Sequence, residues 1–103
     1  MKKVQVIWSN EALGDLEIIY DFIAEKSNNA AKKIIENILS KTNQLESFPE
    51  SGPRQEKIGN TTRAYRYLVE GNYKIIYTYQ PEQSLIYIEV IFDTRLNPEK
   101  IKV

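Results

Sequence analysis

The residues of this chain that could do chemistry are mainly arginines, lysines and tyrosines of its C-terminal half. The basic members are Arg54, Lys57, Arg63, Arg66, Lys74 and Arg95. The tyrosines are Tyr65, Tyr67, Tyr73, Tyr77, Tyr79 and Tyr87. Arginine forks bind phosphate or carboxylate groups, and tyrosine rings stack on bases. For the tyrosines, ordinary packing within strands is the favoured interpretation. For Arg66 and Arg95, a structural and a functional role are both open.

The charge of the chain is balanced overall but unevenly distributed. The 14 basic and 14 acidic residues cancel. Residues 1–53 hold six basic and eight acidic residues, whereas residues 54–103 hold eight and six. The basic excess in the second half is compatible with a local surface that faces an anion or with a solvated loop and strand. A net charge of zero argues against binding to nucleic acid by charge alone, because phosphate contacts dominate such binding.

Most enzyme sites lack the residues they need. The chain has no cysteine and no histidine, which excludes disulfides, thiol or imidazole metal sites and a histidine general base. Its four glycines are not spaced as a phosphate-binding loop requires. The carboxylate pairs Glu11/Asp15 and Asp21/Glu25 have helical spacing and are predicted to decorate a solvated helix face. We therefore expect no metal site and no small-molecule cofactor.

The N-terminal half predicts one strand followed by two helices. Residues 4–8 are β-branched and aromatic, as in a strand, and Ser9-Asn10 offers a helix N-cap. Apolar residues then recur every three or four positions in two stretches, 12–23 and 31–45. Residues 26–29 separate these stretches and can cap the second one. A link this short predicts an antiparallel helical hairpin.

The C-terminal half predicts a loop and three strands. Residues 49–64 are rich in proline and glycine, and the strand-like runs 65–69, 73–80 and 85–92 follow at hairpin spacing. We expect a single domain over residues 1–103, of the α+β class with the order β-α-α-β-β-β. The helical hairpin would cover one face of a four-stranded, mainly antiparallel sheet.

Alternation in the last strand predicts which of its residues meet the helices. The predicted helix-facing residues are Ile86, Ile88, Val90 and Phe92, and those of the other face are Leu85, Tyr87, Glu89 and Ile91. For the middle strand the pattern leaves open which face meets the helices. No apolar run reaches the length of a signal peptide or a membrane span, so we expect a cytoplasmic protein without a membrane partner.

Several short segments of the chain follow one another in an informative order and spacing. They are Trp8-Ser9 before Ala12 and Asp15-Leu16, Ile19 and Phe22-Ile23, Ala31 with Ile34 and Ile38, Leu45 to Phe48-Pro49 and Gly52, Arg66 to Gly71-Asn72-Tyr73-Lys74-Ile75-Ile76-Tyr77, and Val90-Ile91-Phe92-Asp93-Thr94-Arg95. Over nearly the whole chain this order resembles the RelE/ParE superfamily of bacterial type II toxins. The resemblance implies a toxin that a cognate antitoxin, encoded beside it, holds inactive.

The resemblance implies one of two activities. RelE-like members cut mRNA in the ribosomal A site, and ParE-like members poison DNA gyrase. Lys74 and Arg95 match positions where the nucleases keep arginines, and Arg66 lies close to one where they keep a lysine. These three residues would be catalytic in a nuclease. However, residues 97–103 lack the C-terminal tyrosine of the nucleases, and the histidine of a related branch is missing too.

The favoured hypothesis is a ParE-like toxin that binds DNA gyrase and is not an enzyme. The Asp-Leu-x-x-Ile and Phe-Pro-x-x-Gly patterns resemble that side of the superfamily, and the neutral charge agrees with it. Catalytic residues are then unassigned, and the candidates for target binding are Arg54, Lys57, Arg63, Arg66 and Arg95. The alternatives are a ribosome-dependent mRNA endonuclease and a non-toxic relative that only binds its partner.

Overall fold

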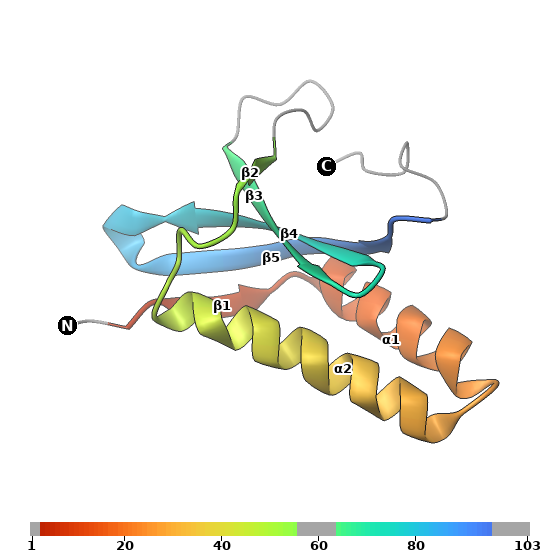
Figure 1. Cartoon of the computed structure of the whole chain (residues 1–103). Coiled ribbons are helices and arrows are strands. Elements are labelled where there is room, and N and C mark those ends of the chain that lie inside the picture. The colour runs from red at the N-terminus through yellow and green to blue at the C-terminus, as the bar shows by residue number, and fades with distance from the viewer. Residues whose placement is uncertain (1–2, 56–63, 96–103) are drawn as a thin grey trace.

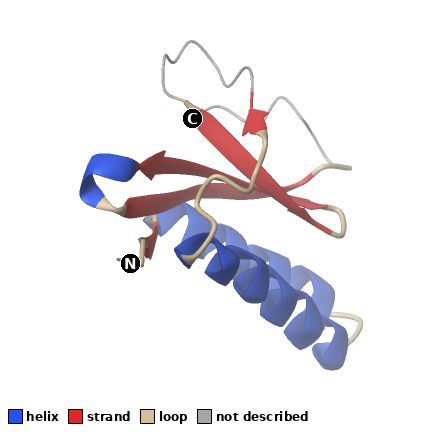
Figure 2. Cartoon of the chain, turned by 60° about the vertical axis from the view of Figure 1, so that its left-hand side comes forward, coloured by secondary structure: helices blue, strands red, loops and turns tan. Residues whose placement is uncertain are grey.

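The protein is described from a computed structural model, which defines residues 3–55 and 64–95. Two helices lie on one side of a sheet, as Figures 1 and 2 show. The helices are α1 (Asn10–Ala24) and α2 (Asn28–Asn43), the latter followed by a 3₁₀ turn, η1 (Gln44–Glu46). The strands are β1 (Gln5–Trp8), β2 (Arg54–Gln55), β3 (Tyr65–Glu70), β4 (Tyr73–Gln80) and β5 (Leu85–Asp93). A second 3₁₀ turn, η2 (Pro81–Gln83), joins β4 to β5.

The sheet confirms the predicted α+β class and element order but has five strands instead of four. Its strand order is β1-β5-β4-β3-β2. β1 runs parallel to β5, and the other three pairs are antiparallel. The additional strand, β2, lies inside the stretch that was predicted to be a loop. It has only two residues and follows Gly52-Pro53, so it offers no alternating run from which to recognise it.

Serine caps position both helices, as predicted from the sequence. The Ser9 hydroxyl accepts a hydrogen bond from the Ala12 N–H at 3.0 Å, and the Ser27 hydroxyl accepts one from the Ala30 N–H at 3.1 Å. Such caps satisfy N–H groups that have no partner within the first turn of a helix. Of the described residues, no helix is long and apolar enough to cross a membrane.

The apolar stripes of the helices are narrower than their spacing predicted. Leu13 is 50% exposed and Leu39 is 39% exposed, although both belong to the predicted stripes. The buried residues of the helix-side core are Val4, Ala12, Ile19, Ile38, Leu45, Leu68, Tyr73, Ile75, Tyr77, Ile86, Ile88 and Ile91. The face of β4 that meets the helices, left open by the sequence, is therefore the one that carries Tyr73, Ile75 and Tyr77.

One prediction for the last strand is wrong beyond its midpoint. Ile88 faces the helices as expected, but Val90 and Phe92 lie on the opposite face, and Ile91 takes their place in the helix-side core. The cause is a register shift between β4 and β5. Tyr77 pairs with Ile88 and Ile76 pairs with Val90, so Glu89 is an extra residue of β5 between these two pairs. A bulge of this kind exchanges the two faces of a strand for all later residues.

Candidate functional site

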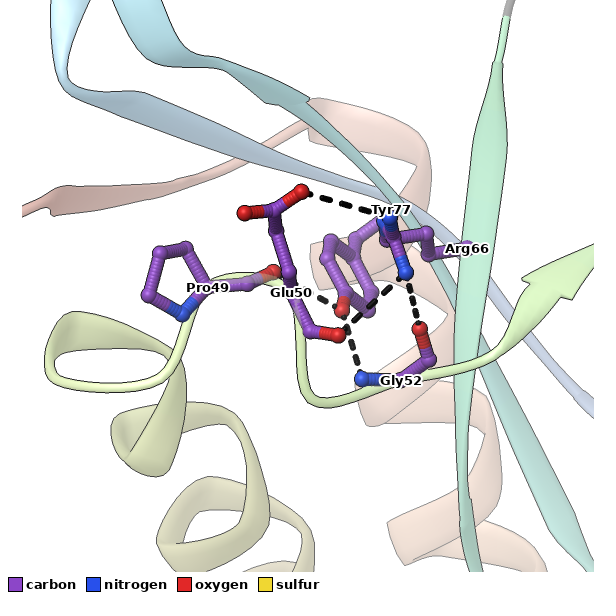
Figure 3. Close-up of polar contacts among 5 residues, drawn as sticks. All are labelled: Pro49, Glu50, Gly52, Arg66 and Tyr77. Carbon is purple, nitrogen blue, oxygen red and sulfur yellow. Dashed lines mark hydrogen bonds and ion pairs between the residues drawn. The ribbon is translucent and has the colours of Figure 1, made fainter.

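The side chain of Arg66 binds the loop between η1 and β2 and so connects it to the sheet. It lies on β3 directly opposite Tyr77, on the helix side, and its side chain is 21% exposed. Its Nη1 donates to the carbonyl of Gly52 at 2.7 Å and to the carbonyl of Glu50 at 3.2 Å, as Figure 3 shows. Its Nη2 lies 3.5 Å from Oε2 of Glu50, a long contact to a carboxylate that is largely exposed. Arg66 therefore uses Nη1 within the fold, and its other nitrogen contact is long.

Tyr77 binds the same loop through its side-chain hydroxyl. Its hydroxyl accepts a hydrogen bond from the N–H of Gly52 and donates one to the carbonyl of Pro49, both at 3.0 Å (Figure 3). Burial raises the pKa of Tyr77, an effect that the hydrogen bond from Gly52 partly opposes. The phenol thus remains neutral and keeps the proton that it donates. Close packing accompanies these bonds, because a Cβ on Gly52 would collide with the Tyr67 carbonyl oxygen and lie 2.8 Å from the Tyr77 hydroxyl.

Lys74 lies on the opposite face of the sheet. It pairs with Val69 on β3 and with Phe92 on β5. Its Nζ stands 4.0 Å from the centroid of the Tyr67 ring, within range of a cation–π interaction. Desolvation by burial lowers the pKa of Lys74. This face holds its own apolar cluster around Ile76, separate from the helix-side core.

Arg95 is bound to the carboxylate of Asp93 at the end of β5. Its Nε donates to Oδ1 at 3.0 Å and its Nη2 to Oδ2 at 2.8 Å, a two-pronged ion pair. The Asp93 side chain is 7% exposed, whereas that of Arg95 is 59% exposed. The hydrogen bonds from Arg95 are the main reason that the pKa of Asp93 is lowered. Arg95 therefore makes the carboxylate contact expected of a structural role and still presents an open edge to solvent.

The structure does not bring the three candidate nuclease residues together. Arg66 lies on the helix side of the sheet and Lys74 on the other side. Asp93, which forms the ion pair with Arg95, lies opposite Tyr73 of β4. Arg66 lies opposite Tyr77, four positions further along the same strand. At about 3.3 Å per residue, four positions correspond to about 13 Å. Between residues 3–55 and 64–95, no group of acidic side chains could hold a metal ion either.

The other candidates for target binding differ in their surroundings. Arg54 lies on β2 directly opposite Arg66 and is exposed. Lys57 and Arg63 fall outside the described residues.

Two polar contacts between the start of α1 and β5 escaped the sequence-based prediction. The Ser9 hydroxyl donates to the carbonyl of Glu89 at 2.8 Å, and the Asp15 carboxylate accepts from the N–H of Ile91 at 2.9 Å. The prediction that Asp15 decorates a solvated helix face is therefore wrong. Its carboxylate is partly buried against β5, and this desolvation raises its pKa. The signal that could have found it is that Asp15 belongs, with Trp8-Ser9, to the segments that carry the family resemblance, which the helical period alone does not explain.

Solved structures share this fold at low sequence identity. The chromosomal ParDE toxin–antitoxin system from P. aeruginosa matches with a TM-score of 0.71 and 18% identity, over 90% of this chain and 98% of the other. The archaeal RelE–RelB complex from Pyrococcus horikoshii OT3 matches with a TM-score of 0.65 and 16% identity, over 92% and 99%. The RelBE2 toxin–antitoxin complex from Mycobacterium tuberculosis matches with a TM-score of 0.58 and 14% identity, over 90% and 93%.

The sequence itself identifies the family. No curated protein matches the chain significantly. Residues 6–97, however, match the family described as the ParE toxin of the type II toxin–antitoxin system parDE. This match begins at the second residue of β1 and extends past the Asp93–Arg95 pair, so it spans both helices and all the later strands. The chain therefore belongs to the ParE toxin family of type II toxin–antitoxin systems.

Proposed function

We propose that this chain inhibits DNA gyrase in the cytoplasm and is neutralised by a cognate antitoxin. Gyrase inhibition is favoured over mRNA cleavage because Arg66, Lys74 and Arg95 lie apart from one another. Nuclease catalysis without a metal needs its proton-transfer and charge-stabilising groups around one scissile phosphate. Here Arg66 and Lys74 lie on opposite faces of the sheet, and the Asp93 partner of Arg95 lies four β4 positions away from the partner of Arg66.

The internal contacts of these residues also favour a binding protein over a nuclease. Arg66 donates from Nη1 to two backbone carbonyls of its own chain, and Arg95 donates from Nε and Nη2 to the Asp93 carboxylate. A guanidinium committed in this way has fewer N–H groups left to stabilise a transition state. Lys74 is the one candidate of the three whose pKa is lowered, but its partners on the neighbouring strands are the apolar Val69 and Phe92.

An antitoxin partner is supported by the family and by apolar surface. The solved structures with this fold that are named above are toxin–antitoxin systems or complexes. Ile18 and Phe22 lie one turn apart on α1 and are 68% and 62% exposed, and Phe48 after η1 is 66% exposed. Large exposed apolar side chains on adjacent turns are typical of a surface that a protein partner covers.

The experiment that tests this function measures two targets with the same purified chain. We expect inhibition of gyrase supercoiling in vitro and, in cells that express the chain alone, growth arrest with an induced SOS response. Co-expression of the neighbouring reading frame should restore growth. Mapping of mRNA ends in the same cells supplies the alternative readout. Fully active gyrase together with mRNA cut at codon boundaries would establish the endonuclease instead, and unaffected growth would indicate the non-toxic relative.

A further inference from the structure

Two arginines face each other across the outermost strand pair. Arg54 on β2 and Arg66 on β3 are direct partners in an antiparallel ladder, so their side chains leave the same face of the sheet about 5 Å apart. Like charges in this arrangement destabilise a strand pair. Arg66 has partners in Glu50 and Gly52, but the exposed guanidinium of Arg54 has no hydrogen-bond or ion-pair partner among the described residues. Among the described residues, therefore, nothing balances this second cation.

A cavity lies where the two arginines meet. It has a volume of about 170 Å³, and its wall includes Arg54, Arg66, Glu50, Tyr79 and Pro81. The loop that Tyr77 and Arg66 hold in place forms one side of it, so the wall is fixed by hydrogen bonds at 2.7–3.2 Å. Two guanidinium groups and one carboxylate give the wall a charge of +1. A single monovalent anion would neutralise this charge and relieve the repulsion between the arginines.

We propose that this cavity binds one carboxylate side chain of the cognate antitoxin, held between Arg54 and Arg66. The proposal rests on the proposed function, because it specifies the chemistry by which that partner is recognised. A carboxylate is favoured over a nucleic-acid backbone by the surroundings. Glu50 on the wall repels a chain of repeated phosphates, and the protein carries no net charge with which to attract one.

Charge reversal at Arg54 separates binding from folding. In Arg54→Glu the new carboxylate faces Arg66, so we expect the free chain to gain a few degrees in its thermal midpoint. The same variant repels the antitoxin carboxylate, so its affinity for the purified product of the neighbouring reading frame should fall at least tenfold. Lys33→Glu, on an exposed turn of α2, makes the same change in net charge and serves as the control. A variant that is more stable yet binds less tightly is not explained by misfolding.

A second measurement examines the cavity without the antitoxin. Titration of the free chain with acetate at constant ionic strength should shift the NMR signals of the Arg54 and Arg66 Nε–H groups, and Arg54→Gln should abolish both shifts. Phosphate is the comparison anion. Unchanged signals in acetate, or a loss of antitoxin affinity that Lys33→Glu reproduces, would overturn the proposal. So would an Arg54→Gln variant that loses affinity for a single-stranded RNA oligonucleotide but keeps it for the antitoxin.

The failure of the proposed function would be recognised separately. Neither readout at Arg54 involves gyrase, so uninhibited gyrase would leave both expected results unchanged. If the wild-type chain forms no complex with the neighbouring product, the assignment of the carboxylate to an antitoxin is wrong, whatever the result with acetate.

Discussion

The Asp15 carboxylate accepts a hydrogen bond from the backbone N–H of Ile91 at 2.9 Å and thereby ties α1 to β5. β1 pairs with β5 only as far as Trp8, which leaves the later backbone groups on this edge of β5 without a strand partner. Ser9 and Asp15 replace the missing strand, the first by donating to the Glu89 carbonyl and the second by accepting from Ile91. The start of α1 thus completes the hydrogen bonding of the sheet.

Asp15→Ala should destabilise the protein, because the N–H of the buried residue Ile91 then loses its acceptor. We expect a loss of about 1–3 kcal/mol in the free energy of unfolding, measured by urea denaturation. Asp15→Asn keeps an acceptor oxygen and should stay within about 0.5 kcal/mol of the wild type. An equal loss in both variants would show that the charge, and not the hydrogen bond, is what the site needs.

The ionisation of Asp15 should also make the free energy of unfolding depend on pH. The pKa of Asp15 is raised above its ordinary value of 3.8 by desolvation, so the folded state holds this proton more tightly than the unfolded chain. Its contribution to stability is fully present below pH 3.8 and is lost as the pH rises through the raised pKa. The stability of Asp15→Asn relative to the wild type should therefore increase over that interval and level off above it. A difference that does not change with pH would contradict the raised pKa.

The two glycines Gly52 and Gly14 should respond oppositely to alanine. Gly52→Ala places a methyl group against the Tyr67 carbonyl and the Tyr77 hydroxyl, so we expect a loss of about 1–3 kcal/mol or more. Gly14→Ala lies within α1 with nothing within 4 Å of the new methyl group and should gain about 0.5–1 kcal/mol. Thermal denaturation of both variants checks the pair. A neutral Gly52→Ala would mean that the loop is not held as closely to the sheet as described.

Tyr77→Phe isolates the hydroxyl that joins the loop to the sheet. The buried N–H of Gly52 and the carbonyl of Pro49 both lose a partner, so we expect a loss of about 1–3 kcal/mol without a change in fold. The raised pKa of Tyr77 adds a second readout, since the wild type loses this phenol's contribution only above pH 10. Tyr77→Phe should lack that alkaline loss. An alkaline profile that matches the wild type would exclude this hydroxyl as its source.

Arg95→Ala tests which role this residue has. The lowered pKa of Asp93 contributes stability above pH 3.8 that is lost as the pH falls through the lowered value. Without Arg95 the pKa of this carboxyl should rise, and acid unfolding should begin at a higher pH. The conservative variant Arg95→Lys keeps a charge but not the two-pronged geometry and should recover only part of the acid resistance.

Toxicity distinguishes the two roles of Arg95. If Arg95 also contacts a target, Arg95→Ala should lose toxicity at neutral pH and moderate temperature, where the variant remains folded. Toxicity that falls only in proportion to the amount of folded protein would show that Arg95 serves the fold alone.

The sequence predicted the elements well because each has a local signal. The serine caps, the two helices and the three strand-like runs all depend on neighbouring residues, and all are confirmed. The predictions failed where the determining contact is distant. β2 is a strand only because Arg54 and Gln55 meet β3, and the bulge at Glu89 exists only in the pairing of β5 with β4.

The candidate site was less predictable for the same reason. The family resemblance grouped Arg66, Lys74 and Arg95, and neither it nor residue type shows which face of the sheet each side chain leaves. Pairing showed that Arg66 shares a face with Tyr77, whereas Lys74 shares one with Val69 and Phe92. For Arg95 the sequence left a structural and a functional role open, and its contact with Asp93, only two residues away, supplies the structural one.

The pairing of the first strand with the last one governs the order in which this chain can fold. Ser9 and Glu89 are hydrogen-bonded although 80 positions separate them in the sequence. β5 also lies between β1 and β4, so no earlier strand can take its place beside β1. During synthesis, the N-terminal strand and the helical hairpin therefore exist for some time without the surface that they will cover. Contacts between residues so far apart slow folding and leave apolar faces open to other chains. The sheet can be completed only after β5 has left the ribosome, and until then the apolar faces of the helices remain exposed.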